Sequence, residues 1–398
     1  MVGERMGKVK QNHRELAKNN RKLVLNLLRR EGITNRKALA KLSGLDPSTI
    51  TKIIKEFINR NLCVETQPEI SGKVGRRTIG LKLSKDAYKS IVVRVGVQVT
   101  EVAIGYFDGT VEHVDTVRSV SNISEFIEKI KKIIYPIIEK ISPDRFLGVS
   151  ISLPGMVDIE NNYIIDVPHL GWRDVNLSDY LDGTIPVFID NEANLSLIAE
   201  KWKNPLIKSV ENAVFVYLSE GIGCGVIVNG QIYRGTFFNA GEFGHMTLDY
   251  GGKECYCGNK GCWETLASTE AIVREYERNF SKLEGSSYND KFMALVKLSE
   301  DNDKALSMIK SEEDYLALGI TNIVNTLSPE YVILGGWASI LSEDSIKSIE
   351  NKVNKRILYA SKRKIKITKS LIDSKEQGLA AVIGAALMIV DRNLEKIV

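Results

Sequence analysis

The fold of this chain is decided by one stretch, Gly241-Glu242-Phe243-Gly244-His245, followed by Cys255-Tyr256-Cys257-Gly258-Asn259-Lys260-Gly261-Cys262-Trp263-Glu264. One histidine and three cysteines fall within eighteen residues of it. The glycines between them let the backbone turn tightly enough to aim all four side chains at one point. One imidazole and three thiolates make a complete tetrahedral set for a zinc ion. The stretch therefore predicts a structural zinc site formed by His245, Cys255, Cys257 and Cys262.

Two other interpretations of these cysteines are ordinary loop residues, or a disulfide with one spare thiol. Three of the five cysteines lie in this window, and a cytosolic protein has little other reason to concentrate them, which favours zinc. Such a site leaves no position for an activated water. The carboxylates of Glu242 and Glu264 flank the ligands and are free for another role.

The composition is that of a globular protein without a membrane segment. At 398 residues, with 43% hydrophobic and 26% charged residues, the chain is long enough for two or three cores. It contains no run of about 18 apolar residues, and its N-terminus has no apolar signal core, so we expect a cytoplasmic protein. Cys63 and Cys224 lie beside apolar residues and are expected to pack as small hydrophobic side chains.

Charge divides the chain into a basic head and an acidic body. Residues 1–84 hold 19 Lys and Arg against 7 Asp and Glu, a net charge of +12. The remainder holds 35 against 43, a net charge of −8. This asymmetry predicts that the head binds a polyanion and that the body does not.

Three helical segments in the head predict a helix–turn–helix. Apolar residues recur on one helical face across residues 14–30, and a short helix is expected over residues 35–42, before the turn Ser43-Gly44-Leu45. The third helix begins at Asp46-Pro47, where aspartate is a good N-cap and proline fits the first helical position. Its inward-facing residues are expected to be Ile50, Ile53, Ile54 and Phe57.

The exposed side of this third helix carries hydroxyl and lysine side chains, which suit a helix in the major groove of double-stranded DNA. A solvated helix face is the alternative, but the basic charge, the tight turn and the three-helix pattern together favour DNA. The expected DNA-binding residues are Arg36 of the second helix, Ser48, Thr49, Thr51, Lys52 and Lys55 of the third helix, and Arg76 and Arg77 of the segment that follows the three helices.

Short extended segments follow at residues 63–66 and 78–83, separated by a basic, glycine-containing segment. They predict a two-stranded wing with Arg76 and Arg77 at its tip, in reach of phosphates or a minor groove. A disordered linker is the alternative for this tip.

From about residue 88 strands and helices alternate, which indicates sheets with parallel parts. Strands are expected at residues 91–97, 102–107, 146–152 and 187–190, and a second half repeats the scheme with strands at 213–218 and 331–336. Ligands of such sheets lie beyond the carboxyl ends of strands, where Pro154-Gly155 and Asn191-Glu192 fall. The final helix, residues 378–391, is apolar and rich in small residues, so we expect it to pack inside.

With these residues assembled, the chain resembles the ROK family of repressors, open reading frames and sugar kinases over nearly its whole length. The segment 241–264 matches the family's zinc signature, and the winged helix resembles the repressor branch, which includes regulators of xylose, glucose and N-acetylglucosamine genes. The resemblance implies an α/β fold with an N-terminal winged helix–turn–helix, followed by a two-lobed, actin-like (ribonuclease H-like) sugar kinase domain. The expected domains are residues 1–84, a first lobe of 85–190 completed by 378–398, and a second lobe of 191–377 with the zinc site.

The same resemblance implies a monosaccharide in the cleft between the lobes. Carboxylates and an imidazole can accept and donate hydrogen bonds to several sugar hydroxyls at once, and zinc would fix the orientation of the imidazole. The expected sugar-binding residues are Pro154, Gly155, Asn191, Glu192, Glu242, His245 and Glu264.

The residues that kinases of the family use for phosphoryl transfer are changed. Glu192 replaces the aspartate base, and its extra methylene moves the carboxylate by more than about an ångström, enough to spoil attack geometry though not hydrogen bonding. Arg94 replaces the metal-binding aspartate, Glu220 enters the phosphate loop, and Trp337 replaces a third glycine. We therefore expect no catalytic residue and no use of ATP.

The resulting hypothesis is a sugar-responsive transcriptional repressor of carbohydrate genes that acts as a homodimer on paired DNA half-sites. One alternative is a ROK sugar kinase with a DNA-binding head, similar to glucokinase or N-acetylglucosamine kinase. Another is a sugar-binding protein without a regulatory role, against which the charge division and the helix–turn–helix argue.

Overall fold

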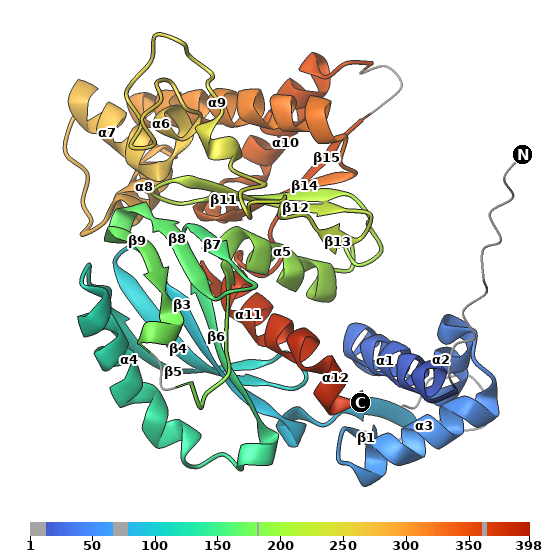
Figure 1. Cartoon of the computed structure of the whole chain (residues 1–398). Helices are drawn as coiled ribbons and strands as arrows, with labels where there is room; N and C mark the ends of the chain where they lie inside the picture. Colours follow the sequence, from blue (N-terminus) through green and yellow to red (C-terminus); the bar gives the residue numbers. More distant parts are fainter. Residues whose placement is uncertain (1–12, 67–78, 181–182, 360–363) are drawn as a thin grey trace, which may run out of the picture. The chain divides into compact units, whose positions relative to one another are not determined.

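The computed structural model describes residues 13–66, 79–180, 183–359 and 364–398. The chain divides into two compact units. The first combines Met1–Lys89 with Tyr106–Thr110 and Val390–Val398, and the second combines Ser90–Gly105 with Val111–Ile389. Figure 1 shows the elements of both units. No helix within the described ranges is long and apolar enough to cross a membrane.

The first unit begins with the three predicted helices, α1 (His13–Glu31), α2 (Arg36–Ser43) and α3 (Pro47–Asn59). Asn35 caps α2 by accepting a hydrogen bond from the Ala38 N–H at 2.9 Å, and Gly44 ends it in the left-handed conformation with φ of 68°. Asp46 caps α3 by accepting from the Ser48 N–H at 2.7 Å. These local caps set the sharp turn between α2 and α3.

The inward face of α3 is as predicted, with Ile50, Ile53, Ile54 and Phe57 buried. They pack in the first unit, where Leu28 of α1 and Leu39 of α2 are also fully buried. Apolar residues recurring at helical spacing thus form the core of the helix–turn–helix.

The wing is a two-stranded antiparallel hairpin of β1 (Cys63–Thr66) and β2 (Gly80–Leu83). Backbone hydrogen bonds between Thr34 and Leu81 attach it beside the start of α2. The predicted tip residues Arg76 and Arg77 lie outside the described residues.

The last residues of the chain pack with the first unit. Helix α12 (Leu394–Ile397) buries Ile397, whose carbonyl oxygen accepts a hydrogen bond from Arg60. Lys18 and Lys22 of α1 form ion pairs with Glu395. Residues 378–398 were expected to complete the first lobe, but Val390–Val398 belong to the first unit, where Glu395 pairs with α1 and Ile397 contacts Arg60.

The second unit contains two five-stranded sheets with the same strand order. If the five strands of each sheet are numbered in chain order, both sheets have the spatial order third, second, first, fourth, fifth. This repeat confirms the predicted two-lobed α/β fold. The first sheet has β3 (Lys89–Val95), β4 (Val99–Tyr106), β5 (Val111–Arg118), β6 (Phe146–Leu153) and β10 (Val187–Asn191); the second has β11 (Ala213–Leu218), β12 (Ile222–Val228), β13 (Gln231–Ile232), β14 (Tyr331–Gly336) and β15 (Lys366–Lys369).

Helices cover these sheets. Helix α4 (Ile123–Ile138) packs its apolar face on the first sheet, and α9 (Asp303–Leu327) with α10 (Glu343–Arg356) pack on the second. Between the two sheets lie α5 (Glu192–Lys203) and α11 (Leu379–Arg392), as Figure 1 shows.

Helix α11 packs inside, as its small apolar residues predict. Ala380, Ala381, Ala385 and Ala386 are fully buried. At Gly384 a Cβ atom would lie only 1.8 Å from the carbonyl oxygen of Leu195 on α5, so the close approach of the two helices requires glycine there.

One sheet was not predicted. Strands β7 (Met156–Asp158), β8 (Tyr163–Val167) and β9 (Trp172–Asn176) form a separate three-stranded meander after β6. The strands are short, and buried and exposed residues do not alternate along β8 and β9, so the sequence gives no clear strand signal there.

Candidate functional site

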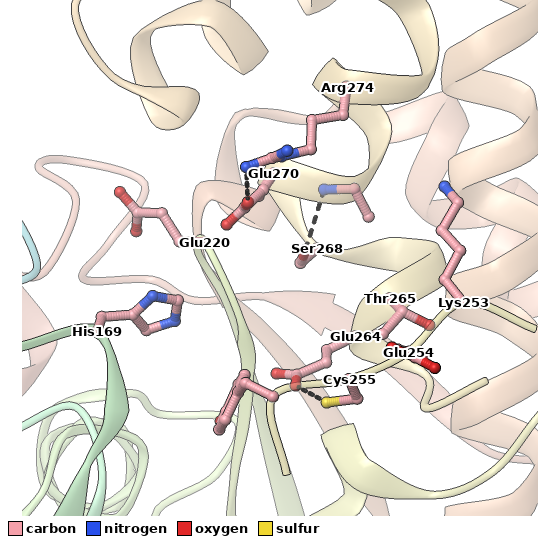
Figure 2. A pocket seen from close by; sticks show the side chains of 12 residues that line it. His169, Glu220, Lys253, Glu254, Cys255, Glu264, Thr265, Ser268, Glu270 and Arg274 are labelled. Atoms are coloured by element: carbon pink, nitrogen blue, oxygen red, sulfur yellow. Dashed lines mark hydrogen bonds and ion pairs between the residues drawn. The ribbon is translucent and has the colours of Figure 1, made fainter. Parts of the chain in front are cut away.

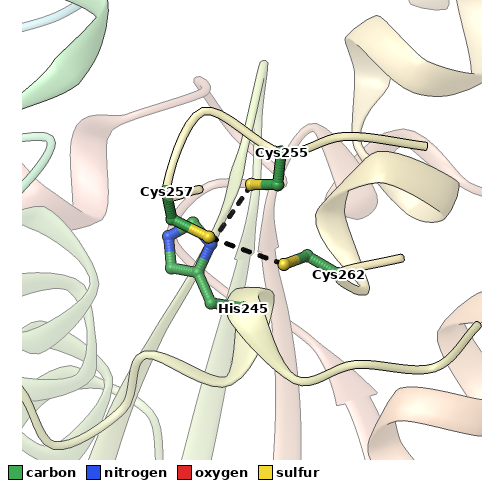
Figure 3. Close-up of side chains that lie close together, drawn as sticks. All are labelled: His245, Cys255, Cys257 and Cys262. Carbon is green, nitrogen blue, oxygen red and sulfur yellow. Dashed lines mark hydrogen bonds between the residues drawn. The ribbon is translucent and has the colours of Figure 1, made fainter. Parts of the chain in front are cut away.

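The structure brings the four predicted metal ligands together. Their ligand atoms, from His245, Cys255, Cys257 and Cys262, all lie within 4.8 Å of one another (Figure 3). His245 ends a short 3-10 helix (Phe243–His245), and the three cysteines lie on the loop that follows. This cluster has the composition and geometry of a metal site.

The distances within the cluster fit a tetrahedral zinc ion. With Zn–S of about 2.3 Å and Zn–N of about 2.0 Å, two sulfurs should be about 3.8 Å apart, and a sulfur and a nitrogen about 3.5 Å. The Cys257 and Cys262 sulfurs are 3.7 Å apart, and Cys255 Sγ lies 3.5 Å from His245 Nδ1. A disulfide needs about 2.05 Å, and all five cysteines are free, which excludes the disulfide alternative.

Two glycines allow the metal-site loop to fold this way. Gly241 has φ of 98°, and a Cβ there would lie 2.2 Å from the carbonyl oxygen of Cys224. Gly261 has φ of 65°, and its Cβ would lie 1.6 Å from the carbonyl oxygen of Asp249. Any other residue at either position would displace the loop from the strand or turn against which it packs.

Two other side chains contact the predicted ligands. The Cys255 thiol donates to Glu264 Oε1 at 2.9 Å, and the same oxygen lies 3.2 Å from His245 Nδ1. On the other side of the imidazole, the Tyr256 hydroxyl lies 3.1 Å from His245 Nε2. With Nδ1 facing the sulfurs, Nε2 is the nitrogen that Tyr256 holds.

The other two cysteines take no part in the site. Cys63 and Cys224 are buried, as predicted for small packed side chains. Burial raises the pKa of Cys63 to about 11 and also raises that of Cys224. Neither thiol is therefore poised to ionise at neutral pH.

A cavity of about 580 Å³ lies beside the metal cluster and is lined by residues of both lobes. The turn after β6 contributes from the first lobe, the junction of β10 and α5 lies at its base, and the metal-site loop contributes from the second lobe. All seven residues predicted from the resemblance line it: Pro154, Gly155, Asn191, Glu192, Glu242, His245 and Glu264.

Asn191 holds two parts of this cavity together. Its Oδ1 accepts a hydrogen bond from the Ala193 N–H at 2.8 Å and so caps α5, while its Nδ2 donates to the Gly155 carbonyl at 2.9 Å. These bonds fix the Pro154-Gly155 turn relative to Glu192, the first residue of the helix.

Sequence reasoning missed several residues of the cavity wall. Asp166, His169 and Arg173 come from the unpredicted meander, and Arg173 pairs with Asp166 at 3.1 Å. Tyr217 lies at the end of β11, and Tyr256 stands between two of the predicted ligands. Of these residues, Tyr256 alone had a signal in the sequence, because it lies between two predicted metal ligands in the Cys-Tyr-Cys segment.

Glu192 has an unusual proton affinity. Burial raises the pKa of its carboxyl to about 7, the carboxylates of Glu220 and Asp373 add to the rise, and the Arg94 guanidinium opposes it. At neutral pH this group is therefore divided between its protonated and ionised forms.

A second cavity, of about 450 Å³, shares Glu192 with the first and has Arg94 in its lining. Arg94 lies there, but it donates to Glu101 at 2.9 Å and to the Tyr217 hydroxyl at 3.0 Å. The ionisable side chains that line this cavity are Arg94 and five acidic residues, which are Glu101, Glu192, Glu220, Asp290 and Glu376. Such a lining repels a triphosphate.

The predicted DNA-binding residues lie in the first unit. Ser48, Thr51, Lys52 and Lys55 are exposed on α3, and Thr49 is partly buried. The Thr51 hydroxyl donates to the Pro47 carbonyl at 2.8 Å, and Arg36 on α2 pairs with Glu65 of β1 at 2.8 Å. The exposed face of α3 is thus polar and basic, whereas Arg36 already has a carboxylate partner.

Residues 90–392 match the model described as ROK family. The chain is 34% identical to the xylose repressor of Bacillus spizizenii, over 85% of this chain and 87% of the relative. It is 31% identical to the xylose repressor of Bacillus subtilis, over 95% and 96%.

A glucokinase of Halalkalibacterium halodurans is 32% identical, but over 52% of this chain and 67% of its own length. Among solved structures, a ROK family transcriptional regulator described as a homologue of the Escherichia coli MLC protein matches with a TM-score of 0.73 and 25% identity. That match covers 96% of this chain and 99% of the other.

Proposed function

Since the chain belongs to the ROK family, we propose that it is a sugar-responsive transcriptional repressor of carbohydrate genes, with a structural zinc ion and no catalytic activity. One observation carries the proposal. The repressor of Bacillus subtilis is similar along 95% of the chain, which includes the helix–turn–helix, whereas the glucokinase is similar along 52%.

DNA binding is assigned to the head, residues 1–84. Exposed Ser48, Lys52 and Lys55 of α3 would enter the major groove and neutralise phosphates. The net charge of +12 on these residues supports this assignment. One winged helix contacts too few base pairs for specific binding, so a homodimer on paired half-sites is part of the proposal.

Sugar binding is assigned to the cavity of about 580 Å³. Glu242 and Glu264 would accept hydrogen bonds from sugar hydroxyls, and Glu192 could accept or donate, because its pKa of about 7 leaves both forms populated. A site with several polar groups rejects molecules that lack matching hydroxyls.

Zinc is assigned to the cluster of one histidine and three cysteines. It would supply rigidity rather than reaction chemistry, because four protein ligands complete the tetrahedron. The chain's own residues transmit that rigidity to the cavity, since His245, Tyr256 and Glu264 line the cavity and contact one another around the cluster.

A sugar kinase is the alternative, and the cavity next to Glu192 argues against it. Phosphoryl transfer needs cations around the phosphates, and the ionisable lining there has an excess of carboxylates. Trp337 and Glu220 also line this space.

The test uses the full-length, zinc-loaded protein. Isothermal titration against glucose, xylose, N-acetylglucosamine, inositol and ATP identifies what binds, and fluorescence anisotropy then measures affinity for its own upstream DNA with and without that sugar at fixed salt. We expect sugar binding without ATP binding and a sugar-dependent change in DNA affinity. Absence of sequence-selective DNA binding under every sugar condition refutes the repressor, and sugar-dependent ADP release establishes the kinase.

A further inference from the structure

A third cavity adjoins the one assigned to the sugar, because the two share part of their lining. This third cavity, of about 390 Å³, shares His169, Glu220, Tyr256 and Glu264 with the lining of the first. Its other walls come from the loop and from helices α6 (Glu264–Ala267) and α7 (Thr269–Asn279), as Figure 2 shows. Each of the two cavities exceeds the about 300 Å³ at which small-molecule sites begin.

Tyr256 stands where the two cavities meet. The residue is 55% exposed, although its side chain is anchored: the hydroxyl lies 3.1 Å from His245 Nε2, and the two rings are nearly perpendicular, at 86°. The centre of the His169 ring lies 5.9 Å from the centre of the Tyr256 ring, and the two rings meet edge to face. An aromatic ring that is both exposed and rigid offers an apolar surface to a ligand at little cost in side-chain entropy.

The charges of the third cavity suit a neutral polar ligand. Its cations are Lys253, which pairs with Glu275 at 3.3 Å, and Arg274, which pairs with Glu270 at 2.7 Å. Its lining also holds the carboxylates of Glu220, Glu254 and Glu264. Carboxylates outnumber cations, which disfavours a phosphate, whereas the ion pairs and Thr265 offer donors and acceptors for hydroxyl groups.

We infer that the effector is a neutral di- or oligosaccharide, with one ring in the first cavity and the next ring against Tyr256 in the third cavity. The inference rests on the proposed sugar-binding function and extends the expected monosaccharide by at least one ring. The C–H face of the second ring packs on the tyrosine, and its hydroxyls bond to Thr265 and to the remaining N–H donors of Arg274.

The test compares xylose with xylobiose, glucose with cellobiose, and both with glucose 6-phosphate, by isothermal titration of the full-length, zinc-loaded protein. We expect at least one disaccharide to bind about tenfold more tightly than its own monosaccharide, the gain that one or two added hydrogen bonds give. If xylose and glucose each bind at least as tightly as xylobiose and cellobiose, or if glucose 6-phosphate binds preferentially, the inference is overturned.

Arg274→Ala tests the location of the second ring, because this exposed side chain lines the third cavity and is not part of the lining of the first. It should weaken disaccharide binding about fivefold and leave monosaccharide binding unchanged. Arg278→Ala is the matched control, one turn further along α7, with an equally exposed side chain that pairs with Glu275 outside the cavity. Equal effects of the two substitutions refute the assignment.

Tyr256→Phe keeps the ring and Tyr256→Ala removes it, so only the second should abolish the preference for the disaccharide, with zinc content measured for both. A failure of the DNA assay in the presence of disaccharide-selective binding would reject the repressor and keep this inference; the reverse result would reject this inference alone.

Discussion

Replacing Glu192 with glutamine should change stability in a way that depends on pH. The folded protein holds the proton of this carboxyl with a pKa of about 7, against an ordinary value of 4.5. A carboxyl whose folded pKa is raised destabilises the fold progressively as pH rises from 4.5 to 7, because the unfolded chain ionises first. Glutamine does not ionise, so the Glu192→Gln variant does not lose folding stability in this way as the pH rises.

The size of the effect follows from the two pKa values. The ionisation penalty of Glu192 comes to about 1.4 kcal/mol at pH 5.5 and about 3.3 kcal/mol at pH 8. The stability difference between Glu192→Gln and the parent should therefore widen by about 2 kcal/mol across this range, whatever the glutamine itself contributes. The chosen pH range stays above the acid conditions in which thiolate ligands take up protons and release a metal.

Urea unfolding at several pH values, followed by tryptophan fluorescence at constant zinc and salt, measures this difference. Glu254→Gln is the control, because the Glu254 side chain is 81% exposed, and it should show no such widening. A stability difference between Glu192→Gln and the parent that is constant from pH 5.5 to 8 would refute the argument that this carboxyl is protonated in the folded state near neutrality.

Three other changes have definite expected outcomes. Cys257→Ser should reduce bound zinc from about one ion per chain to a small fraction and lower the melting temperature, as measured by metal analysis and calorimetry, whereas Cys63→Ser should keep the metal. Glu312→Leu should raise stability at neutral pH and have a smaller effect at pH 5, because burial without a hydrogen-bond partner raises the pKa of this carboxyl. Lys52→Ala should weaken binding to all DNA sequences alike and reduce the salt-dependence slope by about 1, which anisotropy at several salt concentrations would show; a loss confined to the specific site would contradict a phosphate contact.

Local signals in the sequence were sufficient to predict the helix–turn–helix of the first unit. Asn35, Asp46 and Pro47 mark helix starts through chemistry that acts within three residues, and the apolar spacing of α3 selects its buried face. The cluster of predicted metal ligands could be predicted equally well, because its four residues lie in one short segment and are of types that bind zinc. In both cases the interactions that decide the structure are close in sequence.

Features that depend on distant contacts could not be predicted in this way. The meander that supplies His169 and Arg173 has short strands without regular alternation, and it is defined by pairing between strands rather than by its own pattern. The packing of α12 on the first unit depends on Glu395 meeting Lys18 and Lys22, more than 370 residues earlier in the chain. The resemblance to a family, rather than periodicity, brought together the seven residues that line the cavity of about 580 Å³.

The order of events during synthesis follows from the closeness of the metal ligands in the sequence. Closing a loop of eighteen residues costs less conformational entropy than closing a longer one, so the cluster can form as soon as Cys262 is available. The second sheet, by contrast, needs β14 and β15, which begin at Tyr331 and Lys366. Metal binding can therefore organise the loop while the strands that complete its lobe are still being made, and the lobe then assembles on a segment that is already folded.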